Sequence, residues 1–241
     1  MSNIDNGFIK VKPTDICPTY RPGHPESSKE WMAAHNYVDY HRLLPDHYQT
    51  AYEMPREAKD WADAIAGGGP VNNLVLTGNA GTGKTHGGST AAVYLAAVWT
   101  SCDRSLPICF ISAMKLLRVM KDFSDKKTRA EIEHEITSAA VLVLDDIRTM
   151  TEYDIDTVAI LLDERMQSNR PTIVTTNLVG REAIRDACGE TLASRMLNGV
   201  GVPTGGDDRR RPVQVPEKMK QRVPMTRRSE PSRPRRNAGS K

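Results

Sequence analysis

The chain has 241 residues, of which 39% are hydrophobic, and this length favours one domain of ordinary size with additional segments over two full domains. Its longest apolar run, Ala91–Trp99, is far shorter than the roughly 20 residues that a membrane-spanning helix needs, and its first ten residues hold no apolar stretch typical of a secretion signal. The four cysteines include no Cys-x-x-Cys pair and are interpreted as reduced thiols, so we expect a cytoplasmic protein with no membrane partner.

The net charge hides an asymmetry along the chain. The 33 basic and 30 acidic side chains leave a net charge of +3. Residues 212–241 hold nine basic and two acidic side chains with five prolines, a net charge of +7, which leaves residues 1–211 at −4. Because this segment has few apolar side chains to bury, we expect a disordered basic C-terminal tail over 212–241. Such tails often contact nucleic acid; a solvated tail without a specific partner is the alternative interpretation.

Residues 1–69 are predicted to form a short helical N-terminal segment. Apolar spacing predicts one helix between Ser27 and Leu44, and a second over Pro55–Ala66, since Pro suits a first helical turn and the glycines at 67–69 end it. Seven of the 13 aromatic side chains lie here: Tyr20, Trp31, Tyr37, Tyr40, Tyr48, Tyr52 and Trp61. So short a segment cannot bury them all, so residues 20–61 are predicted to pack on the next domain or to bind a partner protein.

Residues 70–211 alternate between predicted strands and helices. Short apolar, β-branched strands are predicted over Asn73–Gly78, Ile108–Ser112, Val141–Asp145 and Thr172–Thr176. Helices are predicted over Thr85–Trp99, Ala113–Lys121, Lys126–Ser138 and Tyr153–Gln167. Strands that are apolar on both faces are typical of a sheet covered by helices on both sides. The fold class is therefore predicted as α/β, a sandwich with a mostly parallel sheet.

A complete phosphate-binding pattern, G-x-x-x-x-G-K-[ST], follows the first of these strands and opens a helix, which is the context that the motif requires. It consists of Gly78, Asn79, Ala80, Gly81, Thr82, Gly83, Lys84 and Thr85. In such a P-loop the backbone amides and the helix N-terminus face the phosphates, the Lys84 ammonium reaches the β- and γ-phosphate oxygens, and the Thr85 hydroxyl ligates Mg²⁺. The sequence therefore predicts ATP and Mg²⁺ as cofactors.

Two later strands end in polar residues that suit nucleotide hydrolysis. Asp145, at the end of the strand over 141–145, is expected to help hold Mg²⁺, as a Walker B carboxylate does. The next residue, Asp146, is placed to orient or deprotonate the attacking water. Asn177 follows the strand over 172–176 and could hydrogen-bond the γ-phosphate or that water, the role called sensor I. The sequence thus predicts a slow ATPase used as a switch.

In this order and spacing, four stretches resemble the AAA+ ATPases of the bacterial and phage helicase-loader clade, the DnaC and DnaI type, with the related IstB-type transposition helper ATPases. The stretches are NLVLTGNAGTGKTH, VLVLDDIR, LLDERMQSNRPTIVTTNL, and ASRMLNG followed by GGDDRR. The likeness spans about 70–211, so we expect a P-loop AAA+ sandwich there. We find no match for residues 1–69, and Arg148 stands where the clade usually has Gly.

The resemblance assigns roles to two arginines. Arg195 matches the arginine finger, which acts in trans on the γ-phosphate held by a neighbouring subunit of a self-oligomer. Arg165 and Arg170 are competing candidates for this contact. Arg209 matches the Arg of the closing G-x-D-x-R pattern and is a candidate sensor II.

The resemblance also places the helices over 113–137 toward single-stranded DNA. Lys115, Arg118 and Lys121 recur every three residues, broadly on one helix face, and could contact phosphates. A solvated basic stripe is an equally good interpretation. The pair Gly87-Gly88, early in the helix after the P-loop, departs from the clade's bulkier residues and either allows close packing or lets the nucleotide base approach.

The leading functional hypothesis is an ATP-dependent loader of a replicative DNA helicase onto single-stranded DNA. In it, ATP binding orders an oligomer around the DNA while residues 20–61 hold the helicase. One alternative is an IstB-type transposition helper ATPase, which shares the core. Another is a nucleotide-dependent DNA-binding adaptor with negligible hydrolysis, which the shorter Asp146 permits.

Overall fold

The computed structural model describes residues 7–10, 53–99, 106–206, 208 and 209. The predicted helix within 27–44, six of the seven N-terminal aromatic side chains and the tail over 212–241 lie outside this part of the chain. In chain order, the elements are β1 (Phe8–Lys10), β2 (Glu53–Pro55), α4 (Arg56–Ala66), β3 (Asn73–Thr77), α5 (Lys84–Trp99), β4 (Ile108–Ser112), α6 (Ala113–Lys121), α7 (Lys126–Ser138), β5 (Val141–Ile147), α8 (Glu152–Gln167), β6 (Thr172–Thr176), α9 (Arg181–Leu197) and β7 (Gly199–Pro203).

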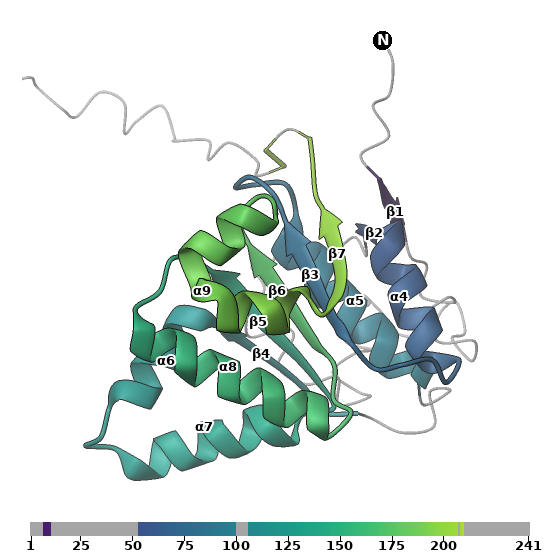
Figure 1. Cartoon of the computed structure of the whole chain (residues 1–241). Coiled ribbons are helices and arrows are strands. Elements are labelled where there is room, and N and C mark those ends of the chain that lie inside the picture. The colour runs from purple at the N-terminus through teal and green to yellow at the C-terminus, as the bar shows by residue number, and fades with distance from the viewer. Residues whose placement is uncertain (1–6, 11–52, 100–105, 207, 210–241) are drawn as a thin grey trace, which may run out of the picture. The chain divides into compact units, whose positions relative to one another are not determined.

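Five strands form one parallel sheet in the order β4-β5-β6-β3-β7 (Figure 1). The chain leaves β3 for β4 through α5 and leaves β6 for β7 through α9. The first connection leads to the β4 edge of the sheet and the second to the β7 edge, and their helices pack on opposite faces of the sheet. In open parallel sheets, ligands bind beyond the carboxyl ends of the strands where connections diverge in this way. The P-loop begins at that end of β3.

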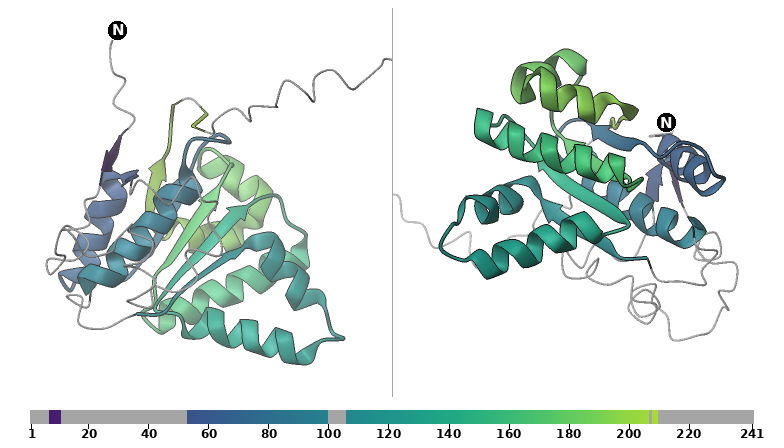
Figure 2. Two further views of the ribbon diagram at one scale, coloured as in Figure 1. Left: turned by 180° about the vertical axis from the view of Figure 1, so that it is seen from behind. Right: turned by 60° about the horizontal axis from the view of Figure 1, so that its bottom comes forward.

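Helices cover both faces of the sheet, as both views in Figure 2 show. Side chains alternate along β3: Leu74 and Leu76 pack with α4 and α5, whereas Val75 packs with α6, α8 and α9 on the other face. Burial on both faces explains why these strands are continuously apolar. The predicted α/β P-loop sandwich with a parallel sheet is confirmed.

Most predicted elements between residues 70 and 180 have the bounds that the sequence indicated, within one or two residues. Arg195 lies in the second half of α9, which begins at Arg181 and kinks at Gly189 (φ 69°). The sequence did not predict β7, whose two glycines weaken its strand signal. It forms because it pairs in parallel with all five residues of β3, and it buries Val202.

The described part of the expected N-terminal segment shares an apolar core with the sheet. The buried face of α4 consists of Ala58, Trp61, Ala62 and Ile65, which follow helical spacing and pack in the same cluster as α5. Trp61 is 4% exposed, and its indole Nε1 donates to Asn72 Oδ1 at 2.8 Å. For Trp61 the structure therefore supports the first of the two predicted outcomes, packing on the next domain, and removes this residue from the predicted partner-binding set.

The unusual pair Gly87-Gly88 allows two close approaches to α5. A Cβ atom on Gly87 would lie 3.0 Å from Pro55 Cδ and 3.1 Å from Phe8 Cε1, in the antiparallel β1–β2 ribbon. A Cβ atom on Gly88 would lie 3.2 Å from Ile173 Cγ2 in the sheet. Close packing on two sides is therefore the reason for these glycines. Within the described ranges, none of the helices is both long and apolar enough to cross a membrane.

Candidate nucleotide-binding site

The P-loop, Gly78–Thr85, connects the carboxyl end of β3 to the first turn of α5. Gly81 (φ 82°) and Gly83 (φ 92°) adopt left-handed conformations that a larger residue would strain. The buried Lys84 side chain folds back over the loop, with its ammonium donating to Gly78 O at 2.7 Å and Asn79 O at 2.6 Å. The predicted motif therefore forms a compact loop with its lysine inside the curve, where phosphate oxygens could take over these contacts.

A β-bulge brings two carboxylates to the carboxyl end of β5. Leu144 pairs with Val174 of β6 and Ile147 pairs with Thr176, so Asp145 and Asp146 both lie opposite Thr175. Asp146 has φ 62°, a left-handed conformation that Asp tolerates better than most residues. Thr175 joins the pair: its hydroxyl donates to Asp145 Oδ1 at 2.7 Å and accepts from the Asp146 amide at 2.9 Å. The Thr175 contribution was not predicted, although this residue lies in the strand that Asn177 follows.

Thr85 and Asp145 meet as a pair suited to Mg²⁺. The Thr85 hydroxyl donates to Asp145 Oδ1 at 2.8 Å, so a hydroxyl oxygen and a carboxylate oxygen from segments far apart in the sequence lie side by side. Burial raises the pKa of Asp145 above its ordinary value, opposed by the hydrogen bonds from Thr175 and Thr85. A desolvated carboxylate of this kind gains from a nearby cation, and hard oxygen ligands are those that Mg²⁺ prefers.

A magnesium ion here would need ligands from phosphates and water as well. Within the described ranges, no group of three or more His, Cys, Asp and Glu side chains gathers as a metal site. The donor set present, Thr85 and Asp145, therefore fits Mg²⁺ delivered with ATP, where it would neutralise charge on the β- and γ-phosphates.

The structure brings Asn177 and Asp146 together at the end of β6 and β5. Asn177 Nδ2 donates to Asp146 Oδ1 at 3.3 Å. The other carboxylate oxygen of Asp146 accepts from Arg148, whose Nε lies 3.0 Å away and whose Nη2 also donates. The residues predicted to handle the attacking water thus form one cluster, and Arg148, noted only as a departure from the clade, is part of it.

Arg209 lies beside the P-loop, in the segment that follows β7. Its backbone amide donates to Gly81 O at 2.9 Å. Its guanidinium stacks over the Phe8 ring, 4.0 Å from the centroid, and Nη1 lies 3.3 Å from Glu53 Oε2. The candidate sensor II residue is therefore near the loop, but its charge is engaged by the β1–β2 ribbon. Sequence reasoning missed Phe8 and Glu53, since nothing links positions so far apart in the chain.

Arg195 lies far from its own P-loop. Its carbonyl accepts from Asn73 Nδ2 at 3.2 Å, at the amino end of β3, and β3 places the P-loop roughly 15 Å away at the other end. The Arg195 guanidinium donates to Asp163 Oδ2 at 2.6 Å, and the side chain is 32% exposed. Arg195 therefore does not serve the site of its own chain, and a role toward a second chain stays a prediction.

The competing candidate Arg165 is excluded by its burial. Its guanidinium donates to four acceptors, Thr172 Oγ1 and the carbonyls of Ile136, Ala139 and Pro171, and the residue is 1% exposed. Burial lowers the pKa of Arg165 to about 10, so it remains charged at neutral pH. A side chain so enclosed cannot reach another subunit. The Arg165 alternative was therefore wrong: this arginine joins the carboxyl end of α7 to the start of β6 by hydrogen bonds.

The three predicted DNA contacts lie on the exposed face of α6. Lys115, Arg118 and Lys121 are exposed, and the buried face is formed by Ala113, Leu116, Leu117 and Met120. Lys121 is paired, since its ammonium lies 2.6 Å from Asp154 Oδ1. Two of the three cations, Lys115 and Arg118, therefore suit phosphate contacts best.

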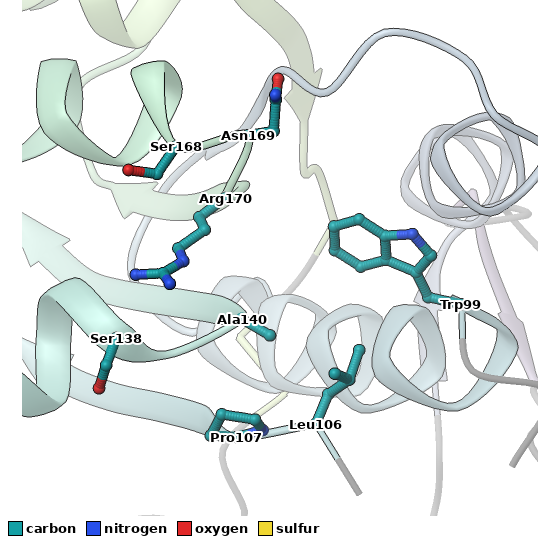
Figure 3. Close-up of a pocket in the computed structure, with 8 residues that line it drawn as sticks. All are labelled: Trp99, Leu106, Pro107, Ser138, Ala140, Ser168, Asn169 and Arg170. Carbon is teal, nitrogen blue, oxygen red and sulfur yellow. The ribbon is translucent and has the colours of Figure 1, made fainter. Parts of the chain in front are cut away.

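A cavity of about 450 Å³ lies at the opposite end of the sheet, beside the amino ends of β4, β5 and β6 (Figure 3). Arg170 is the charged residue in its lining, and the guanidinium donates to Thr137 O. Arg170, the remaining alternative for the trans contact, is thus also engaged within its own chain. Apart from Arg170, this cavity is lined by none of the predicted site residues, so the carboxyl end of the sheet is the candidate site.

Solved structures of replication proteins share this fold. A replication initiator DnaA bound to AMPPCP and single-stranded DNA is 21% identical over 63% of this chain and 46% of that chain, with a TM-score of 0.51. A DnaI structure is 22% identical over 64% of this chain and 83% of its own, also at 0.51. Domain III of DnaA from Thermotoga maritima is 18% identical over 69% and 65%, again at 0.51. The chain spans about half the length of the first of these, and such identities show the fold alone.

Family membership comes from a different comparison. Among curated proteins, no match is found. The family model described as IstB-like ATP binding protein matches residues 65–200, more than half of the chain, and this range contains the P-loop, both aspartates, Asn177 and Arg195. The chain therefore belongs to the IstB-like ATP-binding family, in the clade of AAA+ ATPases that its motifs resemble.

Proposed function

We propose that this protein is an ATP-dependent loader of a replicative DNA helicase onto single-stranded DNA. Its ATPase domain comprises residues 70–211, residues 1–69 contribute the helicase contact, and the basic tail over 212–241 adds affinity for DNA. Because Trp61 packs in the protein's own core, the proposed helicase contact rests on the aromatic side chains between Tyr20 and Tyr52.

One observation carries the proposal: the groups predicted to handle the phosphates, Mg²⁺ and the attacking water converge at one edge of the sheet. Lys84 lies inside the P-loop, Thr85 and Asp145 share a hydrogen bond, and Asp146 contacts Asn177. A protein that only binds nucleotide needs no residue for the attacking water. We infer that the site hydrolyses ATP with bound Mg²⁺, and that hydrolysis resets a DNA-bound state.

Support for helicase loading comes from the motif resemblance to DnaC- and DnaI-type loaders, with DnaI sharing the fold. Support for DNA binding comes from the exposed Lys115 and Arg118 on α6 and from the basic tail. A second candidate, an IstB-type transposition helper, is favoured by the family model itself, which carries that name. The two functions share the ATPase core and differ in the partner.

Capture of the partner separates the two candidates. The full chain, with Mg·ATP, is mixed with the purified replicative helicase of the same organism, and in parallel with a transposase encoded beside an IstB-type gene. Helicase capture that depends on Lys84 supports loading. Transposase capture without helicase capture supports the helper function and contradicts the proposal.

We further propose that Arg195 acts in trans on the γ-phosphate of a neighbouring subunit. Arg195→Ala is then expected to bind ATP like the wild type but to hydrolyse it slowly, whereas Lys84→Ala loses both. In a mixture of the two variants, some interfaces pair an intact P-loop with an intact Arg195, so activity partly returns. If mixed oligomers form and stay inactive, the trans role is wrong.

A further inference from the structure

The segment that follows β7 is attached to the P-loop at two points. Near its start, the hydroxyls of Thr204 and Thr82 share a hydrogen bond of 2.8 Å, and both side chains are buried. Farther along, the Arg209 amide donates to Gly81 O at 2.9 Å. These contacts place the segment along one side of the loop, so a change in the loop reaches the segment directly.

Between the two attachments, the Asp208 carboxylate lies against the backbone of Gly81 in the middle of the P-loop. A Cβ atom on Gly81 would overlap Cγ and both oxygens of this carboxylate. Gly81 has no side chain, so its backbone is open to close approach. The backbone amides of a P-loop are the groups that bind phosphate. A negative charge of the chain itself is therefore held against the phosphate-binding backbone.

The cation next to this carboxylate is committed to other partners. Arg209 follows Asp208 directly, yet its guanidinium stacks over the Phe8 ring at 4.0 Å and lies 3.3 Å from Glu53 Oε2. The segment thus presents its carboxylate to the loop and its guanidinium to the β1–β2 ribbon. A triphosphate seated on the loop would bring several negative charges close to Asp208, and like charges repel at such short range. This arrangement suits a loop without nucleotide better than a loop that holds ATP.

The Asp208 carboxylate can leave the loop without disturbing the sheet. Its side chain is exposed, and two exposed glycines, Gly205 and Gly206 (φ 103°), follow the buried Thr204. A Cβ atom on Gly205 would meet no atom of the described residues within 4 Å, so packing does not fix the chain at this point. The part of the segment that carries Asp208 can therefore turn away while Thr204 and β7 stay in place.

We propose that Asp208 is an autoinhibitory residue of the nucleotide site: its carboxylate opposes the triphosphate at Gly81, and Mg·ATP binds by displacing it from the loop. The affinity for ATP is then lower than the P-loop alone would give. Asp208 stands at an unspecified position of the G-x-D-x-R pattern that ends at Arg209, so this carboxylate is a feature of this chain rather than of the pattern. The inference rests on the proposed ATP site and adds a control of its affinity.

The test is a calorimetric titration of the wild type and of Asp208→Asn, which removes the charge and keeps the shape. The Kd for Mg·ATP is expected to fall about tenfold in the variant, and the Kd for AMP by less than about twofold, because the repulsion grows with the number of phosphate charges. Added NaCl should shrink the difference for ATP, since the exposed charge is screened. Asp208→Glu keeps the charge and should bind ATP within about threefold of the wild type.

A matched control removes the same charge elsewhere. Asp186 is exposed on α9, and Asp186→Asn should leave the Kd for Mg·ATP within about twofold of the wild type. Displacement is measured by hydrogen exchange at the Arg209 amide, which Gly81 O holds in the absence of nucleotide. In the wild type saturated with Mg·ATP, this amide should exchange at least about fivefold faster, while the amides of β3 exchange no faster.

The inhibition is overturned if a folded Asp208→Asn binds Mg·ATP no more tightly than the wild type. Weaker binding by this variant also overturns it, because the carboxylate would then help to hold Mg²⁺ or the nucleotide. Unchanged exchange at Arg209 in the ATP-saturated wild type contradicts the displacement. Failure of the ATP site itself is distinguishable: in that case Lys84→Ala binds Mg·ATP as well as the wild type does, whatever Asp208→Asn shows.

Discussion

The two ends of the parallel sheet use the same kinds of residue in different ways. At the amino end, Asn73 is 1% exposed; its amide donates to Arg195 O and its oxygen accepts from the Thr172 amide. At the carboxyl end, Asn177 is exposed and donates to the Asp146 side chain. The first asparagine binds backbone groups of α9 and β6, and the second binds the carboxylate of another side chain.

Two arginines repeat this difference. Arg165 is buried and donates to three carbonyls and one hydroxyl, whereas Arg148 is mostly exposed and donates to a carboxylate. A polar group held by backbone acceptors is part of the architecture, and removing it leaves buried groups without a partner. A group held by another side chain can change partners when a ligand arrives. The comparison therefore teaches which polar residues to assign to stability and which to function.

The largest expected effect is on the amino end. Arg165→Leu removes the donor to the carbonyls of Ile136, Ala139 and Pro171, and it should lower the free energy of unfolding by about 3–5 kcal/mol. Urea denaturation measures this loss. Arg185→Leu, an exposed control, should change it by less than about 0.5 kcal/mol. Equal midpoints for the two variants would show that the buried contacts are not structural.

A smaller effect of opposite sign is expected at the carboxyl end. Burial raises the pKa of Asp145, so the carboxyl group binds its proton more tightly in the folded chain than in the unfolded chain. The free energy of unfolding therefore falls as the pH rises from the unfolded-state pKa through the folded-state pKa of Asp145. Asp145→Asn should therefore stabilise the nucleotide-free protein by up to about 1 kcal/mol at neutral pH. It should also lose most of the stabilisation that Mg·ATP gives the wild type. Thermal unfolding with and without Mg·ATP checks both, and a less stable nucleotide-free variant would contradict the argument.

The smallest effect is expected where the β1–β2 ribbon meets α5. Gly87→Ala gains helix propensity but places a methyl group about 3 Å from Phe8 and Pro55, so the net change in stability should stay within about 0.5 kcal/mol. The packing of the β1–β2 ribbon against α5 should nevertheless become weaker. Hydrogen exchange of the β1 amides should speed up in this variant while exchange in β3 does not change. Unchanged exchange in β1 would mean that the ribbon tolerates the methyl group.

The sequence could predict what local patterns encode. The alternation of apolar strands and helices predicted a parallel sheet covered by helices, and the P-loop motif predicted which end of that sheet binds the nucleotide phosphates. The bulge at Asp145 and Asp146 was not predictable, because it depends on how β5 pairs with β6. The stacking of Arg209 on Phe8 joins the two ends of the described chain and leaves no local signal. Arg165 was misjudged because burial, which decides its role, is not visible in a charged residue near a helix end.

Calorimetric titration of Mg·ATP into the wild type and Lys84→Ala tests the central claim most directly, that the carboxyl end of the sheet forms the ATP site. Lys84 lies inside the P-loop within 2.7 Å of Gly78 O, where its charge would meet the phosphates. We predict stoichiometric binding to the wild type and affinity lower by on the order of 100-fold in the variant, since a charge-assisted contact is lost. Equal affinities in two folded proteins would contradict the account.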